Sequence, residues 1–327
     1  MSIEDCAQEV VGTRASASRT VVAVDVGGTT IKAARVDESG RTQSSITLPT
    51  GTGAEAFHKV MLVCEELCDS TTMATSIAVP GIVNHDTGVV HKSINLDWSE
   101  IALGELVENQ IAVPTSVVHD VRAACAAEVE IGLGRDVSDM LIVAIGTGLS
   151  AGIISGGIQI SGATFSAGEI GHLVVRPGGE LCACGQRGCV EVYASAGGIL
   201  RRYAALGGDP SLSVARISSS PDPVAVSVWQ DATELLAQAF AAIVVTLDPS
   251  LIVIAGGLSL AGTALTTPLR AALASQLAWR SAPDIQLSSL TSRAGLAGAA
   301  IEAWRLAGLP ETTRLWSSSL ALTTQQG

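Results

Sequence analysis

One histidine and three cysteines lie close together near the middle of the chain. They are His172, Cys182, Cys184 and Cys189, in the pattern Gly-Glu-Ile-Gly-His-(x9)-Cys-x-Cys-x4-Cys. One imidazole and three thiolates form a complete tetrahedral zinc set that leaves no open position for water, so the zinc would be structural. Thiolates at this density repel one another without a cation, and we expect the loop to unfold when the metal is removed. Three buried or free cysteines beside an unrelated histidine are the alternative.

Two glycine-rich turns have the chemistry to hold phosphate. The first is Asp25-Val26-Gly27-Gly28-Thr29-Thr30-Ile31-Lys32, and the second is Gly146-Thr147-Gly148. Glycine has no Cβ, so backbone amides can approach phosphate oxygens, and threonine hydroxyls add donors. Asp25, at the end of a buried strand, could hold Mg²⁺ through water, because Mg²⁺ prefers oxygen ligands. Either turn alone also fits an ordinary hairpin, but two such turns in similar settings favour a shared nucleotide.

A further glycine pair and three acidic residues complete the candidate chemistry. Gly256-Gly257 follows a buried strand and leaves room for an adenine or a ribose, although a turn from strand to helix fits equally. Asp120 stands between a strand and a helix. Its carboxylate can accept a proton from a hydroxyl that attacks phosphorus, or it can cap the helix. Glu169 and Glu191 flank the cysteine cluster, whose fixed loop could direct both toward a polyol; surface solvation is the alternative.

The elements that must position these residues repeat along the chain. The first half predicts strands at 21–26, 31–36, 76–79 and 113–118 and helices at 54–67 and about 122–130. The second half predicts strands at 140–145, 151–155 and 251–255 and helices at 235–247 and 295–307. A strand, a glycine turn and a returning strand open each half. We therefore predict two similar α/β halves with a cleft between them and with mixed sheets, since hairpins are antiparallel and helix-linked strands are parallel.

Length and composition agree with two domains around an aliphatic core. The chain has 327 residues, of which 47% are hydrophobic, 3% aromatic and 15% charged. A chain of this length exceeds what a single core usually supports. We expect a disordered tail at 1–19, an N-terminal α/β domain at 20–120, a C-terminal α/β domain with the zinc loop at 121–309, and a tail at 310–327.

Charge and targeting patterns exclude several classes of protein. The net charge is −12, and an acidic surface repels a phosphate backbone, so nucleic acid is a poor partner. Residues 1–19 lack the basic-then-apolar pattern of a signal peptide. Glycine and hydroxyl residues interrupt uncharged stretches such as 250–269, so we expect no membrane span. Seven cysteines without a secretory signal argue against a disulfide framework, and we expect a cytoplasmic protein.

In this order, these pieces resemble the ROK family (repressor, open reading frame, kinase) of bacterial sugar kinases and sugar-responsive regulators. The resemblance covers about residues 21–306 and is most specific at Gly168-Glu169-Ile170-Gly171-His172 followed by Cys182-x-Cys184-Gly-x-x-Gly-Cys189-x-Glu191. The two glycine turns resemble the family's first and second phosphate motifs. The resemblance implies the two-domain α/β fold of the actin, Hsp70 and hexokinase superfamily (ribonuclease H-like), closing on a nucleotide in an interdomain cleft.

The resemblance also implies roles that the pattern alone leaves open. It implies that Asp120 is the general base. It implies that Glu169, His172 and Glu191 contact sugar hydroxyls, with His172 also ligating zinc. The implied ligands are a hexose and ATP with Mg²⁺, and the implied assembly is a homo-oligomer, either a dimer or a tetramer.

The sugar side carries both matches to the family and departures from it. Asn95-Leu96-x-Trp98 resembles the family's sugar-side loop, with Pro80-Gly81 beside it. His119 stands where the family commonly has a sugar-binding asparagine, which bears on the preferred sugar. Asp120-Val121-Arg122 replaces a common Asp-Ala-Asn. The second phosphate turn continues as Leu149-Ser150-Ala151-Gly152 instead of with several glycines, which bears on nucleotide affinity.

Three functions follow as hypotheses. The first is an ATP-dependent hexose kinase that phosphorylates the 6-hydroxyl, with glucose as first choice; N-acetylmannosamine, N-acetylglucosamine and fructose stay open, as does polyphosphate as donor. The second is a sugar-sensing repressor, which would need a helix-turn-helix domain. The short segment before the first strand and the net charge of −12 argue against one. The third is a catalytically weak sugar-binding protein.

Overall fold

Two five-stranded sheets of the same topology form the framework of residues 18–317, the part of the chain that the computed structural model describes. The first sheet has the order β3-β2-β1-β4-β8. Its strands are β1 (Thr20–Val26), β2 (Thr30–Asp37), β3 (Thr42–Pro49), β4 (Thr72–Val79) and β8 (Thr115–His119). β1, β2 and β3 pair antiparallel, whereas β1, β4 and β8 pair parallel.

The second sheet repeats this arrangement with the order β11-β10-β9-β12-β13. Its strands are β9 (Met140–Ile145), β10 (Leu149–Ser155), β11 (Ile158–Gln159), β12 (Leu251–Ala255) and β13 (Asp284–Leu287). The first three pair antiparallel, and the last two extend the sheet in parallel. The prediction of two similar halves with mixed sheets is therefore confirmed. A smaller sheet of β5 (Ile82–Asn84), β6 (Val89–Ser93) and β7 (Trp98–Ile101) adds to the first half.

The first sheet is covered on both faces. Successive strand residues point to opposite faces, so Val22 and Val24 pack with α1 (Gly53–Leu67) and α2 (Leu103–Ile111). Val21 and Ala23 pack with α3 (Asp120–Ile131) and α9 (Ala294–Leu306) on the other face. The unbroken apolar run of β1 is explained by this burial on two sides.

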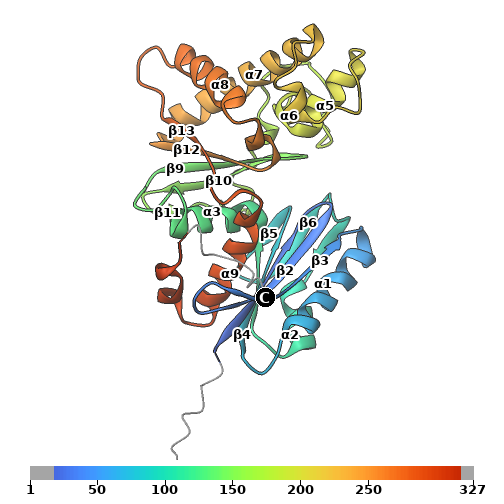
Figure 1. Ribbon diagram of the computed structural model, residues 1–327, viewed down its shortest axis with the longest axis vertical. Coiled ribbons are helices and arrows are strands. Elements are labelled where there is room, and N and C mark those ends of the chain that lie inside the picture. The colour runs from blue at the N-terminus through green and yellow to red at the C-terminus, as the bar shows by residue number, and fades with distance from the viewer. Residues whose placement is uncertain (1–17, 318–327) are drawn as a thin grey trace, which may run out of the picture.

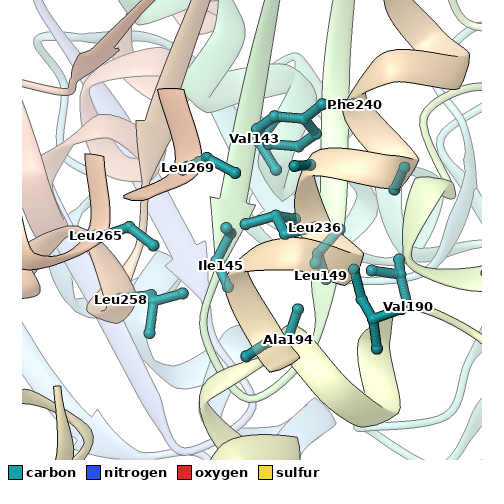
Figure 2. Packing of buried hydrophobic residues seen from close by; sticks show 14 of the residues in the cluster. Val143, Ile145, Leu149, Val190, Ala194, Leu236, Phe240, Leu258, Leu265 and Leu269 are labelled. Carbon is teal, nitrogen blue, oxygen red and sulfur yellow. The ribbon is translucent and has the colours of Figure 1, made fainter. Parts of the chain in front are cut away.

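The second sheet is covered mainly by two long helices, α7 (Pro223–Leu247) and α8 (Thr263–Gln276). Figure 2 shows Leu236 of α7 and Leu269 of α8 beside Val143 and Ile145 of β9. The opposite face packs against Cys125 of α3. The remaining helices are α4 (Glu191–Ala194), α5 (Ala196–Ala205), α6 (Val214–Ile217), η1 (Ile170–His172), η2 (Gly257–Ala261), η3 (Thr291–Arg293) and η4 (Pro310–Leu315).

The two halves are stacked along the long axis of the molecule, with α3 between the two sheets (Figure 1). Near the end of the described chain, α9 returns to the first half and packs against β1, β4 and α3. Beyond it, Trp316 is buried, and its Nε1 donates to Glu38 O at 3.0 Å. The division into domains at 120 and 309 stays a prediction, and the expected tails fall partly on residues 1–17 and 318–327, outside the described residues.

Most predicted elements are confirmed to within two residues, and the clearest difference is the start of α7. The prediction began at 235, but α7 begins at Pro223. Asp222 caps it by accepting from Val224 N, and proline is favoured in a first helical turn. The structure also adds β3, α2, α8 and β13, which the sequence analysis did not place. Within residues 18–317, no helix is long and apolar enough to cross a membrane.

Candidate active site and metal centre

The first glycine turn and Asp120 meet at one edge of the first sheet. β1, β4 and β8 are parallel neighbours, with Asp25 opposite Ala78 and Val79 opposite His119. Because parallel strands end at a common edge, Asp25 and Asp120 lie close enough for the charge of Asp120 to raise the pKa of Asp25. Gly81 follows β4 with φ of 114°, a conformation that favours glycine.

Asp25 is the strongly perturbed acid of this edge. Burial, the largest effect, and the charge of Asp120 together raise the pKa of its carboxyl group, Lys32 lowers it, and the net value is about 7. A Cβ on Gly295, in the first turn of α9, would lie 2.8 Å from Asp25 Oδ1, so the helix backbone closes over the carboxylate. Lys32 Nζ in turn donates to Ser292 O at 3.1 Å. Burial disfavours the ionised form of this carboxyl group, so a nearby cation would stabilise its carboxylate.

The first turn is held by Thr50, a residue that the sequence analysis missed. Thr50 Oγ1 donates to Gly27 O at 2.7 Å, and Thr50 N donates to Thr29 O at 3.0 Å. Thr50 comes from the end of β3, and nothing in its local pattern distinguishes it from any turn threonine. Only the antiparallel pairing of β2 with β3 brings Thr50 to this position.

The predicted sugar-side loop lies next to the first turn. A Cβ on Gly28 would be 3.8 Å from Asn95 Cβ. Two hydrogen bonds to the start of α1 fix the loop: Gly53 N donates to Leu96 O at 2.7 Å, and Trp98 Nε1 donates to Gly53 O at 2.9 Å. The loop 95–98 is therefore a rigid neighbour of the glycine turn.

Four acidic and imidazole side chains form a continuous row from Asp120 to the cysteine cluster. His119 Nε2 lies 3.4 Å from Asp120 Oδ1 and 3.9 Å from Glu169 Oε1. Glu169 Oε2 lies 3.9 Å from His172 Nε2. Asp120 is the first residue of α3, and its Oδ1 accepts from Val121 N at 2.7 Å; the residue at the cap position is His119. The row presents alternating acceptors and donors, the groups that a polyol needs.

The cysteines and the histidine converge on one point. The ligand atoms of His172, Cys182, Cys184 and Cys189 all lie within 4.8 Å of one another. Cys184 Sγ and Cys189 Sγ are 3.7 Å apart, and His172 Nδ1 and Cys182 Sγ are 3.8 Å apart. A tetrahedral zinc with sulfur at about 2.3 Å requires sulfur–sulfur separations of about 3.8 Å. The donor set and its spacing fit zinc.

The histidine serves two neighbours with its two ring nitrogens. Nδ1 of His172 faces the cysteine sulfurs, and Nε2 faces Glu169. A ligating imidazole commonly pairs its second nitrogen with a carboxylate, which orients the ring. Burial and then the neighbouring Cys184 and Cys182 raise the pKa of Cys189 to about 12, so its thiolate needs a cation to form. The cysteine cluster and the acidic row are therefore directly connected.

The second glycine turn and the Gly256-Gly257 pair lie together at the edge of the second sheet. β9 and β12 are parallel neighbours, with Ala144 opposite Ala255. Gly256 has φ of 81°, and a Cβ there would lie 2.6 Å from Ile145 O, next to the start of the 146–148 turn. A Cβ on Gly146 or Gly257 would meet nothing within 4 Å. The backbone at both positions is uncovered by side chains, and this open space fits a nucleotide. Gly257 also begins η2, which agrees with the alternative of a turn from strand to helix.

Arg122, one of the departures from the family pattern, is a buried residue whose side chain connects two segments by hydrogen bonds. It is 6% exposed, its Nη2 donates to Val83 O at 2.8 Å, and its Nη1 lies 3.5 Å from Phe165 O. Burial lowers the pKa of its guanidinium, and the charges of Asp120 and Glu169 oppose that change. The side chain thus links β5 to the loop that precedes Glu169, a role that its position in the sequence did not indicate.

Known proteins similar to this chain include several sugar kinases. A glucokinase from Streptomyces coelicolor is 32% identical over 304 residues, which cover 85% of this chain and 96% of that protein. An N-acetylmannosamine kinase from Citrobacter koseri is 32% identical over 246 residues, which cover 74% of this chain and 84% of that one. Among solved structures, a ROK family glucokinase from Streptomyces griseus in complex with glucose and AMPPNP superposes with a TM-score of 0.77 at 29% identity, covering 88% of this chain and 99% of that chain.

The fold, the site and these relatives define the class as the ATP-dependent sugar kinases with the actin and hexokinase fold. The ROK family model matches residues 21–305. The chain belongs to the ROK family.

Proposed function

We propose that this kinase transfers the γ-phosphoryl group of ATP to the 6-hydroxyl of a hexose, with glucose as the first substrate to test. The observation that carries the proposal is the row Asp120, His119, Glu169 and His172, whose Asp120 end lies near Asp25 at the first glycine turn. Carboxylates and imidazoles in a row suit a polyol, and glycine turns suit phosphates. Relatives named glucokinase agree with this choice of sugar.

In the proposed mechanism Asp120 accepts the proton of the sugar hydroxyl as the hydroxyl oxygen forms a bond to the γ-phosphorus. The bond from that phosphorus to the β–γ bridging oxygen breaks, and ADP leaves with that electron pair. Glu169, His119 and Glu191 orient the sugar. Asn95 and Gly81 border it. Domain closure would exclude water and so protect ATP from hydrolysis.

The nucleotide is proposed to bind between the two turns and the 256–257 pair. The residues assigned to it are Asp25, Gly27, Gly28, Thr29, Thr30, Lys32, Gly146, Thr147, Gly148, Gly256 and Gly257. Mg²⁺ would neutralise phosphate charge near Asp25, which would lower the pKa of that carboxyl group.

Zinc is proposed as a structural ion held by the histidine and the three cysteines of the cluster. With four protein ligands it has no open position and takes no part in phosphoryl transfer. Its contribution is to hold the loop 172–191, whose first and last residues lie at the proposed sugar.

The decisive experiment measures ADP release in steady state with a panel of hexoses, and repeats it with Asp120→Asn. We expect the variant to bind sugar as the wild type does, while kcat falls by about three or more orders of magnitude, as for other essential catalytic groups. Turnover near the wild-type rate would remove Asp120 from the role of base. Sugar binding without turnover of any sugar in the wild type would favour a sensing or regulatory protein instead.

N-acetylmannosamine is the second candidate sugar, because a relative of equal identity carries that name. N-acetylglucosamine and fructose belong in the same panel, and polyphosphate in a parallel donor series. We further propose that the protein is cytoplasmic, in keeping with the use of ATP. We also propose that it forms a homo-oligomer, a dimer or a tetramer, which light scattering at several protein concentrations tests.

A further inference from the structure

Glu191 makes a contact that sugar binding does not require. Its Oε2 accepts a hydrogen bond from Leu149 N at 2.9 Å. Leu149 directly follows the Gly146-Thr147-Gly148 turn and begins β10. One oxygen of a carboxylate assigned to the sugar is thus bound to the backbone of the nucleotide turn. A hydrogen bond to an ionised group is also stronger than one between neutral groups.

The space around this carboxylate is shaped by two glycines. A Cβ on Gly148 would lie 2.9 Å from Oε2 of Glu191, and one on Gly171 would lie 3.2 Å from the same atom. Gly148 belongs to the nucleotide turn, and Gly171 belongs to η1, which also holds His172. The carboxylate therefore fills the space between the two segments. A larger residue at Gly148 would displace it, whereas a Cβ on Gly171 would first meet the backbone oxygen of Leu149.

Further contacts join the nucleotide turn to the segment that follows Glu191. Ala196 N, at the start of α5, donates to Gly146 O at 2.8 Å, and Ser195 N donates to Glu191 O at 3.1 Å. Leu149 and Val190 belong to one buried cluster, and Figure 2 shows them beside each other next to Ala194. Residues 146–149 and 190–196 are thus held together by hydrogen bonds and by a shared core.

We propose that Glu191 is a positioning residue for the nucleotide turn and that it couples the sugar site to the nucleotide site. This inference rests on the proposed function. A sugar hydroxyl that donates to Oε1 restrains the carboxylate whose other oxygen orders Leu149 N, so bound sugar pre-organises the turn for phosphate. By linkage, bound nucleotide must then raise sugar affinity by the same factor.

The test measures the dissociation constant of AMPPNP with Mg²⁺ by titration calorimetry, first without sugar. In Glu191→Ala the turn loses its acceptor, and we expect binding to weaken about tenfold, the loss typical of one hydrogen bond to a charged group. Glu191→Gln keeps a carbonyl oxygen for Leu149 N, so its nucleotide affinity should stay within about twofold of the wild type. A residue that only contacts sugar would leave nucleotide affinity unchanged in both variants.

Glu169→Ala is the matched control, since it removes a carboxylate from the proposed sugar site but not from the turn. It should leave AMPPNP affinity without sugar unchanged. Zinc content and melting temperature of Glu191→Ala are measured alongside; if the zinc is lost, Glu191→Asp replaces it, because the shorter side chain keeps the charge but withdraws the acceptor from Leu149 N. Weakened nucleotide binding in Glu191→Asp with zinc retained would support the coupling.

The second measurement repeats the titration with saturating glucose, or with whichever hexose the panel selects. In the wild type the sugar should tighten AMPPNP binding severalfold, and in Glu191→Ala this gain should be lost. Unchanged AMPPNP affinity in both Glu191→Ala and Glu191→Asp would overturn the inference while leaving the kinase proposal intact. A wild type that binds no AMPPNP would overturn both.

Discussion

At the scale of single residues, the acidic side chains of the site differ in burial and in the groups that they contact. Asp25 lies under the first turn of α9 beside a second carboxylate, so its proton is held up to about pH 7. Glu191 has a backbone N–H for one oxygen, and Glu169 stands between two imidazoles. Residue type alone did not separate these environments.

The raised pKa of Asp25 predicts a pH-dependent stability for the protein without nucleotide. The unfolded state loses this proton near pH 4 and the folded state near pH 7, so the folded state binds more protons in between. Stability should therefore fall as the pH rises from about 4 to 7 and then level off. Between pH 5 and 8, the free energy of unfolding of the wild type should drop by about 3 kcal/mol relative to Asp25→Asn, as urea titration measures. A pH-independent difference between the two proteins would contradict the assignment.

At the scale of secondary-structure elements, the loop between η1 and α4 is the segment for which we propose a structural zinc ion. It carries few hydrophobic side chains into the core, and its isolated bridges join Val174 to Cys189 and Leu181 to Arg187. A four-ligand zinc site supplies the missing stability in such loops.

Cys184→Ser should therefore lose bound zinc and about 5 kcal/mol of stability, a fraction of the binding energy of a complete site. Zinc content by atomic emission and chemical denaturation provide the measurements. Cys68→Ser is the control, because Cys68 lies in the first half, where its Sγ is 3.6 Å from Thr75 Oγ1; it should retain its zinc. Full zinc occupancy in Cys184→Ser would refute the ligand assignment.

The close contact between α3 and α9 is a second feature at the scale of secondary-structure elements. Gly298 of α9 faces the backbone carbonyl of Ala123 in α3 so closely that a Cβ would overlap it. Gly298→Ala should therefore destabilise the protein by about 2 kcal/mol, although in an open helix the same change stabilises by about 1 kcal/mol. A melting temperature above that of the wild type would show that α3 and α9 can move apart without a loss of stability.

At the scale of the whole molecule, the two halves are joined on the side of the proposed sugar site. Arg122 of α3 donates to Val83 O of the first half and approaches Phe165 O of the second. The ring of Phe165 lies 5.5 Å from that of His85, edge to face, and 6.5 Å from that of His91. These contacts hold the loop that leads to Glu169.

Arg122→Ala should release this loop. We expect the KM for the sugar to rise about tenfold, since a charged hydrogen bond that positions Glu169 is lost. The KM for ATP should change by less than about twofold, because the nucleotide turns lie elsewhere. Initial rates over both substrates separate the two constants. Equal increases in both would point to a general loss of structure instead.

Much of this architecture could be predicted because local patterns and the final fold agree. Three strands, β1, β9 and β12, are continuous apolar runs, and α3 is rich in alanine. All four elements are buried in the fold, so their sequence patterns identified them. The cysteine cluster was also predictable, since all four ligands come from one short segment and the chain between them has little freedom to separate them.

What the sequence determined by itself is thus the chemistry available and its local order: a metal set, two glycine turns, a lone aspartate after a strand. What only the tertiary structure decided is which of these groups meet. Thr50 reached the first turn through strand pairing, Gly295 reached Asp25 through the return of α9, and Glu191 reached Leu149 N through a shared core. Such contacts join residues far apart in the chain, and they depend on packing that no short window of sequence contains.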